Sequence, residues 1–268
     1  MYDCIIIGKG PCGISCAIYL KRFNKNVLVI GSNYGSLEKA SVIENYYGVG
    51  SISGLELAKK GEEQAKNLNI EVITDEVLEI EGLTVKTKTN EYNAKAIFLA
   101  TGKTNKVNIP GINDIVVSYC ATCDGFFFRK KKIALIGYGD YMLHEYDVLK
   151  NFTSDITVFT NENINSEYVN GKITKLFSND NKKCVEVNNT VYEFDGIFIA
   201  ANNDSLAISK HLGLVVDDNN KIMVENYKTN IDGIFAGGDA IGGLDQVSTS
   251  VSDGAKAAIE INKFLKEE

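Results

Sequence analysis

Two cysteines separated by two residues are the clearest candidates for chemistry in this sequence. Cys120 and Cys123 lie in the stretch "SYCATCDG", a spacing that allows a small-ring disulfide. Such pairs exchange electrons because one thiol can be held as a thiolate while the other is exposed to a partner. Asp124 follows directly and can relay the proton that thiol exchange requires. The stretch therefore predicts a redox-active pair.

A metal site and a structural disulfide are the alternatives for this pair. Zinc would need a second CxxC or a CxxH, and neither Cys184 nor a histidine offers that spacing, so no metal is expected. The N-terminus "MYDCIIIGKG" lacks the features of a signal peptide or a membrane span, which predicts a cytoplasmic protein. A structural disulfide is disfavoured in that reducing compartment. The other cysteines are expected to be buried thiols: Cys4, Cys12, Cys16 and Cys184.

A glycine-rich turn near the N-terminus predicts a dinucleotide site. The strand "YDCIIIG" leads into Gly8-Lys9-Gly10-Pro11-Cys12-Gly13, and a helix-compatible run follows. In such a turn the first glycine permits the bend, the second lets the backbone approach a pyrophosphate, and the third lets helix and strand pack closely. The next strand, "NVLVIG", ends in Gly31-Ser32, where an acidic residue normally holds a ribose.

A second stretch, "IFAGGDA" at 234–240, predicts the place of a flavin. An apolar strand ends there in two glycines and Asp239, and a helix starts near residue 246. Glycines such as Gly238 allow a flavin to lie against the backbone, and Asp239 can accept hydrogen bonds from ribityl hydroxyls. The helix N-terminus could stabilise the negative charge of a reduced flavin.

Length and composition predict two α/β domains. The chain has 268 residues, which exceeds the usual size of one domain. A formal charge of −7 and a pI near 5.1 argue against nucleic acid or an anionic membrane as partners. A second strand–glycine turn–helix unit begins at "IALIG", and the stretch 165–200 alternates polar and apolar residues, which predicts short antiparallel strands including "GIFIAA". Pro110 and Gly111 mark a boundary between the domains.

Taken in order, these motifs resemble the low-molecular-weight thioredoxin reductases. The resemblance rests on the N-terminal fingerprint and on "IENYYG" (43–48), "ATGKTNKVNIPG" (100–111), "CATCDG" (120–125) and "GIFAGGDA" (233–240). It implies a homodimeric FAD enzyme of two Rossmann-like three-layer domains. The FAD-binding domain is then discontinuous, at 1–112 and 226–268. The inserted domain, 113–225, carries the CxxC motif on a shortened form of the family's NADPH-binding domain.

The resemblance also implies roles for individual residues. Cys123 would face the flavin, Cys120 would attack the thioredoxin disulfide, and Asp124 would be the acid or base. The residues implied to bind FAD are Gly8, Gly10, Pro11, Cys12, Gly13, Asn45, Ala100, Thr101, Gly102, Gly238, Asp239, Gln246 and Val247.

The inserted domain departs from the family at its nucleotide motif. The turn reads Gly137-Tyr138-Gly139-Asp140-Tyr141-Met142, with Met142 in place of a small residue, and no arginine or histidine follows the next strand. A 2′-phosphate beside Glu162 would be repelled. The usual helix after that strand is also missing, and Asp245 stands where the family has an arginine next to the flavin. In lacking the NADPH motifs the chain is similar to the ferredoxin-dependent flavin thioredoxin reductases.

The expected function is therefore an FAD-dependent disulfide reductase that takes electrons from ferredoxin and passes them to thioredoxin. Ferredoxins are acidic, and 129–132 (RKKK) is the one dense basic cluster, although such a cluster is more often a solvated surface. Two alternatives stay open. One is an enzyme that uses NADH or NADPH, with Glu162 near a ribose hydroxyl; the other is a flavin-bound redox sensor without turnover.

Overall fold

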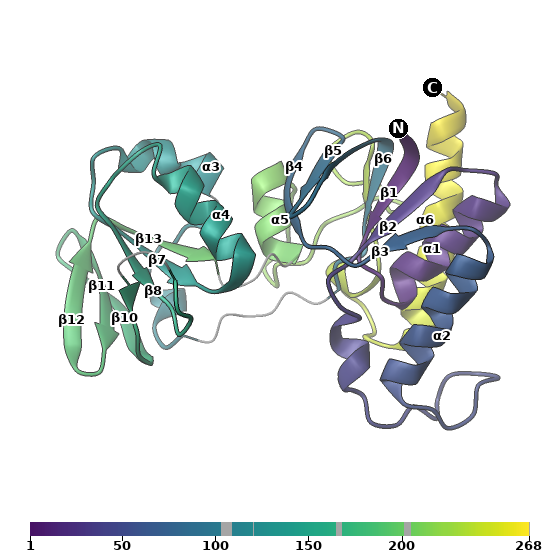
Figure 1. Cartoon of the computed structure of the whole chain (residues 1–268), viewed down its shortest axis with the longest axis horizontal. Coiled ribbons are helices and arrows are strands. Elements are labelled where there is room, and N and C mark those ends of the chain that lie inside the picture. The colour runs from purple at the N-terminus through teal and green to yellow at the C-terminus, as the bar shows by residue number, and fades with distance from the viewer. Residues whose placement is uncertain (103–108, 120, 165–167, 201–204, 268) are drawn as a thin grey trace. The chain divides into compact units, whose positions relative to one another are not determined.

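A computed structural model describes residues 1–102, 109–119, 121–164, 168–200 and 205–267, and within these ranges the side chains of Lys39, Asn113, Thr122, Cys123, Ser205 and Leu206 are not described. The chain forms two compact units (Figure 1). Unit 1 comprises Met1–Thr104 and Asp204–Glu268, and unit 2 comprises Asn105–Asn203. One unit is thus made of two separate segments of the chain.

Unit 1 is built on a sheet whose parallel strands come from both segments. Its strands are β1 (Tyr2–Ile7), β2 (Val27–Ile30), β3 (Glu71–Ile73), β4 (Val77–Glu81), β5 (Thr84–Thr87), β6 (Glu91–Leu99) and β14 (Ile234–Ala236). Its helices are α1 (Pro11–Arg22), α2 (Gly54–Asn67), α5 (Ser205–Leu212) and α6 (Val247–Glu267). The strand order is β3-β2-β1-β6, where β14 pairs in parallel with the end of β6, and β5 and β4 continue from its start as an antiparallel meander.

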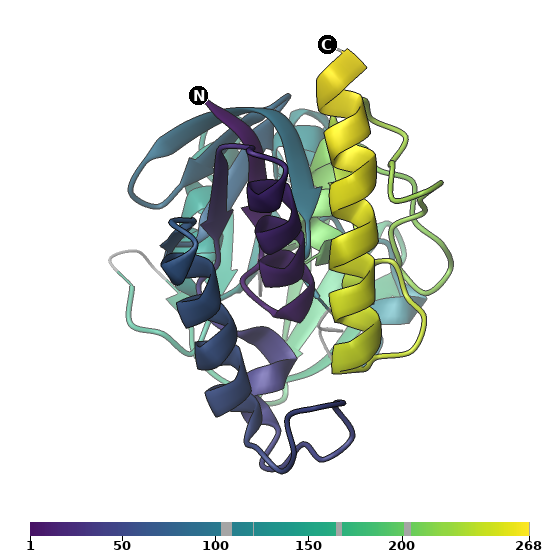
Figure 2. The same ribbon diagram turned by 90° about the vertical axis from the view of Figure 1, so that its right-hand side faces the viewer.

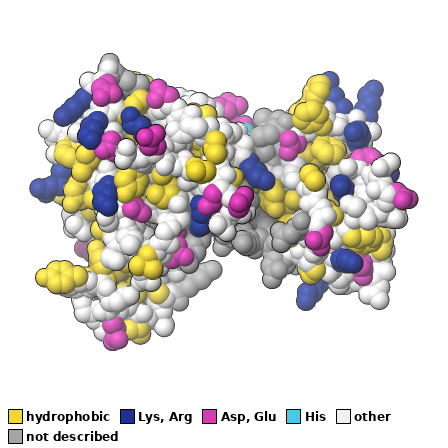
Figure 3. Space-filling view, turned by 180° about the vertical axis from the view of Figure 1, so that it is seen from behind, with side chains coloured by type: hydrophobic (Ala, Val, Ile, Leu, Met, Phe, Trp, Pro, Cys, Tyr) yellow, Lys and Arg dark blue, Asp and Glu magenta, His cyan; other side chains and the backbone are white. Residues whose placement is uncertain are grey.

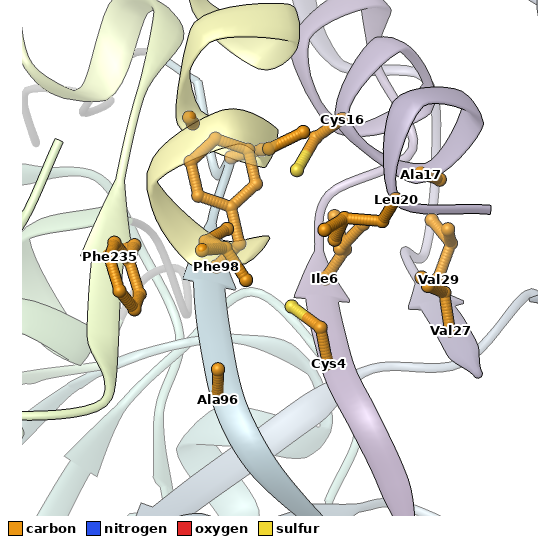
Figure 4. Close-up of a cluster of buried hydrophobic side chains, with 14 of the residues drawn as sticks. Cys4, Ile6, Cys16, Ala17, Leu20, Val27, Val29, Ala96, Phe98 and Phe235 are labelled. Carbon is orange, nitrogen blue, oxygen red and sulfur yellow. The ribbon is translucent and has the colours of Figure 1, made fainter. Parts of the chain in front are cut away.

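The two faces of this sheet bury alternate residues of each strand. Cys4 and Ile6 of β1 belong to a core that also holds Phe98 and residues of α1 and α6 (Figure 4). Ile5 and Ile7 belong to the opposite core, with residues of β4 and β5. Both faces are covered because parallel strands pack on both sides, which explains the unbroken apolar run of β1.

Three helices lie side by side on one face of the sheet: α2, α1 and α6 (Figure 2). Gly254 of α6 lets this helix approach α1, since a Cβ there would lie 2.1 Å from the carbonyl oxygen of Cys12. Helices, parallel sheet and meander make three layers, and the predicted α/β fold class is confirmed.

The boundary of the second segment differs from the sequence expectation. Residues 205–225 group with unit 1, although the sequence placed everything up to 225 in the inserted domain, and residues 109–112 group with unit 2, although the sequence placed them in the FAD-binding domain. The reason is burial: Ile208, Leu214 and Ile222 are part of the core beside β4 and β5. The sequence shows that these positions are apolar, but it does not show which of the two domains buries them.

Unit 2 has a second parallel sheet and an antiparallel one (Figure 1). Its strands are β7 (Ile133–Gly137), β8 (Ile156–Phe159), β9 (Tyr168–Val169), β10 (Ile173–Asn179), β11 (Lys182–Val187), β12 (Thr190–Phe194) and β13 (Gly196–Ala200). Its α-helices are α3 (Ala121–Asp124) and α4 (Gly139–Leu149), and a 3-10 turn at Gly125–Phe128 continues from α3. The parallel order is β13-β7-β8-β9, and β10, β11 and β12 form the antiparallel sheet.

One strand of unit 2 corrects the sequence expectation. The antiparallel prediction holds for β10, β11 and β12, but β13 pairs in parallel with β7. All five residues of β13 are buried, as in parallel strands that are covered on both faces. The apolar run "GIFIA" therefore belongs to the parallel, Rossmann-like sheet and not to the antiparallel sheet of β10, β11 and β12.

Charge is mixed on the surface. Lys and Arg side chains are interspersed with Asp and Glu on the face shown in Figure 3. Among the described residues, no helix is both long and apolar enough to cross a membrane.

Candidate functional site

The N-terminal turn of unit 1 has the geometry of a phosphate cradle. Gly8 has a φ of +112°, and a Cβ there would lie 2.1 Å from the carbonyl oxygen of Ala100. A Cβ on Gly13 would lie 1.9 Å from the carbonyl oxygen of Gly8, so only glycine lets α1 start this close to β1. The space where a Cβ of Gly10 would point is open to 4 Å, and Pro11 begins the helix. This opening lets a pyrophosphate approach the backbone at the N-terminus of α1.

The neighbouring strand end leaves a polar atom without a partner. Ala100 donates its N–H to Ile7 at 2.8 Å, which holds the start of "ATG" beside β1. The hydroxyl oxygen of Thr101 is buried and has no hydrogen-bond partner among the described residues, and Gly102 follows with a φ of +76°. A buried polar atom of this kind normally has a partner. The unsatisfied hydroxyl thus fits a site completed by a bound polar group.

Other residues predicted to bind the flavin come together from distant parts of the chain. Asn45 donates from its amide nitrogen to Gln246 at 2.9 Å, a contact between residues 201 apart. Val247 then begins α6. Gly238 has a φ of +67° and lies against Cys12, since a Cβ on Gly238 would be 2.9 Å from the Cβ of that cysteine.

Asp239 is anchored beside this glycine. Its carboxylate accepts a hydrogen bond from Ser250 of α6 at 3.1 Å, and its carbonyl accepts one from Lys221 at 2.7 Å. The fingerprint, the "ATG" turn and the "GGD" turn all follow the carboxyl ends of adjacent parallel strands, where ligands of such sheets bind. These residues fit an FAD molecule, and their individual contacts with it stay predictions.

The predicted redox motif is only partly described. Cys120 lies outside the described residues, and Cys123 is described only by its place in α3. Asp124 ends this helix, and its carboxylate accepts a hydrogen bond from the hydroxyl of Ser118 at 2.7 Å. Ser118 is buried and pairs through its backbone with β13, where Ile197 and Ile199 exchange hydrogen bonds with it. A rigid strand therefore positions the predicted acid or base.

Helix α4 holds the backbone on both sides of Cys120. Glu145 is 4% exposed, and its carboxylate accepts the N–H of Ala121 at 2.6 Å. Tyr141 lies one turn earlier, and its hydroxyl donates to the carbonyl oxygen of Tyr119 at 3.4 Å. Residues four apart face the same side of a helix. Side chains on one face of α4 therefore hold the backbone on either side of the first cysteine of the redox pair.

Side chains of the protein occupy the second glycine turn, which leads into α4. Met142 is fully buried, and its Cγ lies 2.9 Å from where a Cβ of Gly137 would be. Gly139 begins α4 with a φ of +72°, and its N–H donates to the carboxylate of Glu162 at 2.7 Å. A helix N-terminus binds phosphate through such amides. Here the carboxylate of Glu162, a residue of the chain itself, already accepts a hydrogen bond from that amide.

The four other cysteines are buried, as predicted. Burial raises the pKa of the Cys16 thiol well above its ordinary value, and it does the same for Cys12, where Asp253 and Asp239 add to the effect. Burial also raises the pKa of the Cys184 thiol. Thiols of raised pKa are poor nucleophiles. Among the described residues, no three His, Cys, Asp or Glu side chains gather as a metal site.

Sequence reasoning missed three residues that position the redox motif. Ser118, Tyr141 and Glu145 hold this motif or its flanks, yet the sequence assigned none of them a role. Glu145 offered one usable signal, because it lies three residues after Met142 and four after Tyr141, which places a charge on the same side of the helix as two apolar residues. A charge at such a position is rarely buried without a specific partner.

Comparison with known proteins gives the class to which the chain belongs. The family model described as pyridine nucleotide-disulphide oxidoreductase matches residues 2–160 and 140–254. The chain is 32% identical over 306 residues to the thioredoxin reductase of Bacillus subtilis, covering 100% of this chain and 96% of the relative. The chain therefore belongs to the pyridine nucleotide-disulphide oxidoreductase family, in its thioredoxin reductase group.

Solved structures of thioredoxin reductases resemble this chain over its whole length. The atypical thioredoxin reductase of Desulfovibrio vulgaris Hildenborough matches with a TM-score of 0.90 at 30% identity, covering 100% of this chain and 99% of the other. A ferredoxin-flavin thioredoxin reductase of Clostridium acetobutylicum matches with a TM-score of 0.77 at 28% identity, with the same coverage. The family implies a flavin oxidoreductase.

Proposed function

We propose that this protein is an FAD-dependent disulfide reductase that reduces thioredoxin through Cys120 and Cys123, with electrons from reduced ferredoxin and not from NADPH. The observation that carries the choice of donor is the second glycine turn, where Glu162 accepts the N–H of Gly139. A dinucleotide pyrophosphate there would lose that amide and meet a like charge. Met142 adds bulk at the same turn.

The chain's own residues supply binding, positioning and proton transfer. The glycine turns after β1 and β14 would hold the flavin, which when bound can accept electrons singly and pass them on as a pair. Asp124, held by Ser118, would carry the proton for the thiol that leaves during exchange. Glu145 and Tyr141 would keep the backbone around Cys120 in place. We further propose a homodimer in the cytoplasm, as the resemblance implies.

The NADH alternative loses support from the same contact. It needs Glu162 to hold a ribose hydroxyl, whereas this carboxylate accepts the N–H of Gly139. The sensor alternative differs from the proposal only in turnover, so one assay separates them.

That assay is anaerobic, with the FAD-loaded protein, oxidised thioredoxin and one donor at a time: reduced ferredoxin, NADPH or NADH. We expect thioredoxin thiols to accumulate over many turnovers with ferredoxin alone. A Cys120→Ser variant should abolish them, and Cys184→Ser, which changes a buried thiol of the same unit, should not. Rapid bleaching of the flavin by NADPH together with formation of thioredoxin thiols would refute ferredoxin as the required donor. The absence of turnover with all three donors would refute the proposal that the protein is an enzyme.

A further inference from the structure

A buried lysine lies inside the N-terminal fingerprint. Lys9, between the glycines of the turn, has a side chain that is only 5% exposed. Its ammonium donates to the hydroxyl of Thr74 at 2.8 Å and lies 3.4 Å from the carboxylate of Glu62. It also lies over the ring of Tyr34, 4.5 Å from the centroid. A buried ammonium is costly unless such partners satisfy it, so these contacts account for a charge in this place.

The partners of Lys9 come from separate elements at one edge of the sheet. Thr74 follows β3, Tyr34 follows β2, and Glu62 lies on α2. Glu62 also accepts hydrogen bonds from Tyr34 and Lys66. Burial alone would raise the pKa of Glu62, but the hydrogen bonds from Lys66 and Tyr34 and the charge of Lys9 hold it below its ordinary value. The carboxylate therefore stays ionised opposite the lysine.

The lysine occupies the place from which a ribose is normally held. In a dinucleotide fold an acidic residue at the end of the second strand binds the ribose next to the pyrophosphate. Gly31 ends that strand here, and a Cβ on Gly31 would lie 2.9 Å from both the Cγ and the backbone nitrogen of Lys9. A side chain at position 31 would therefore clash with both the backbone and the stem of Lys9.

We propose that Lys9, through its contacts with Thr74 and Glu62, positions the adenosine end of the FAD site and replaces the strand-end acidic residue. This inference rests on the proposed cofactor. Lys9 acts as a positioning residue: it ties the fingerprint turn to the segments that follow β2 and β3, and the end of the second strand is where the ribose of a dinucleotide is held. The flavin ring is then held by other residues, so a defect at Lys9 should be confined to the adenosine end.

The test compares Lys9→Met, which keeps the stem and removes the charge, with Lys66→Met, which removes an exposed partner of the same Glu62. Dissociation constants of FAD and of ADP are measured on the apoprotein. We expect Lys9→Met to weaken both by about 10-fold or more, as the loss of a hydrogen bond to a charged group predicts. Lys66→Met should stay within about 2-fold of the parent, because exposed ion pairs contribute little.

At saturating FAD the flavin spectrum and reduction potential of Lys9→Met should match those of the parent. Unchanged binding of FAD and ADP would overturn the inference, as would weaker FAD binding with unchanged ADP binding or an altered flavin potential. If Lys9→Met fails to fold, Thr74→Val decides in the same assays, because it removes one partner and keeps the charge. Failure of the parent itself to bind FAD would instead refute the proposed cofactor.

Discussion

Replacing Glu145 by leucine tests how α4 holds the redox motif. Leucine has a similar size, so the substitution removes the acceptor of the Ala121 N–H without leaving a large cavity. Ala121 is fully buried, and water cannot readily replace the lost partner. Glu145→Gln keeps a neutral acceptor at the same place. Asp147→Asn is the matched control, because Asp147 lies on the same helix in an exposed ion pair with Lys150.

The size of the effect follows from the type of bond. A hydrogen bond to a charged group contributes about 1.5–3 kcal/mol, and a buried donor left unsatisfied costs about 1–3 kcal/mol. We take about 2 kcal/mol for Glu145→Leu, which corresponds to a factor of about 30 in the local opening equilibrium. For Glu145→Gln we expect about 1 kcal/mol, or a factor of about 5, and for Asp147→Asn no measurable change.

Amide hydrogen exchange measures this opening at the residue concerned. The Ala121 amide should exchange about 30-fold faster in Glu145→Leu and about 5-fold faster in Glu145→Gln, while the amides of β10–β12 should change far less. Exchange at Ala121 within about 2-fold of the parent in the leucine variant would refute the reasoning. Equal acceleration in both variants would show that the charge of Glu145 adds nothing to the bond.

Three further outcomes are expected. Met142→Ala should lower the free energy of unfolding of unit 2 by about 2–5 kcal/mol in urea titrations, because it empties a fully buried position; a loss below about 1 kcal/mol would contradict its packing against Gly137. Gly13→Ala should lower the free energy of unfolding by about 1–3 kcal/mol and weaken FAD binding, because the new Cβ would lie 1.9 Å from the carbonyl oxygen of Gly8. An unchanged melting temperature would contradict this close contact. The pKa of Glu62 is lower in the folded protein than its ordinary value of 4.5, so the ionised carboxylate stabilises the fold at a pH above 4.5. This stabilisation is lost as the pH falls through the pKa that Glu62 has in the folded protein. Glu62→Gln should therefore lose less melting temperature than the parent between about pH 5 and pH 3, and parallel curves would contradict this.

The main elements of the fold could be predicted because their signals are local. The apolar run of β1, the glycine fingerprint and the alternation of β10–β12 lie within short stretches of sequence. The wrong prediction for β13 shows that local signals do not identify the partner of a strand. A short apolar strand fits a parallel or an antiparallel partner equally well, and its neighbour β7 lies far away in the sequence.

The candidate site divides in the same way. The fingerprint, the "GGD" turn and the CxxC motif are recognisable because each needs a fixed spacing along the chain. Asn45 and Gln246 were each implied by the resemblance, but their contact spans 201 residues and only the fold shows it.

By itself the sequence determined the class of the protein, its two α/β domains and its candidate chemistry, since backbone turns and strand patterns depend on neighbouring residues. Only the tertiary structure decided the partners of the buried Lys9 and of the amide that begins α4. Lys9 meets Thr74 across 65 residues, and Glu162 meets Gly139 across 23. Which side chain satisfies a buried charge or a helix amide depends on which elements pack together, and no local spacing encodes that.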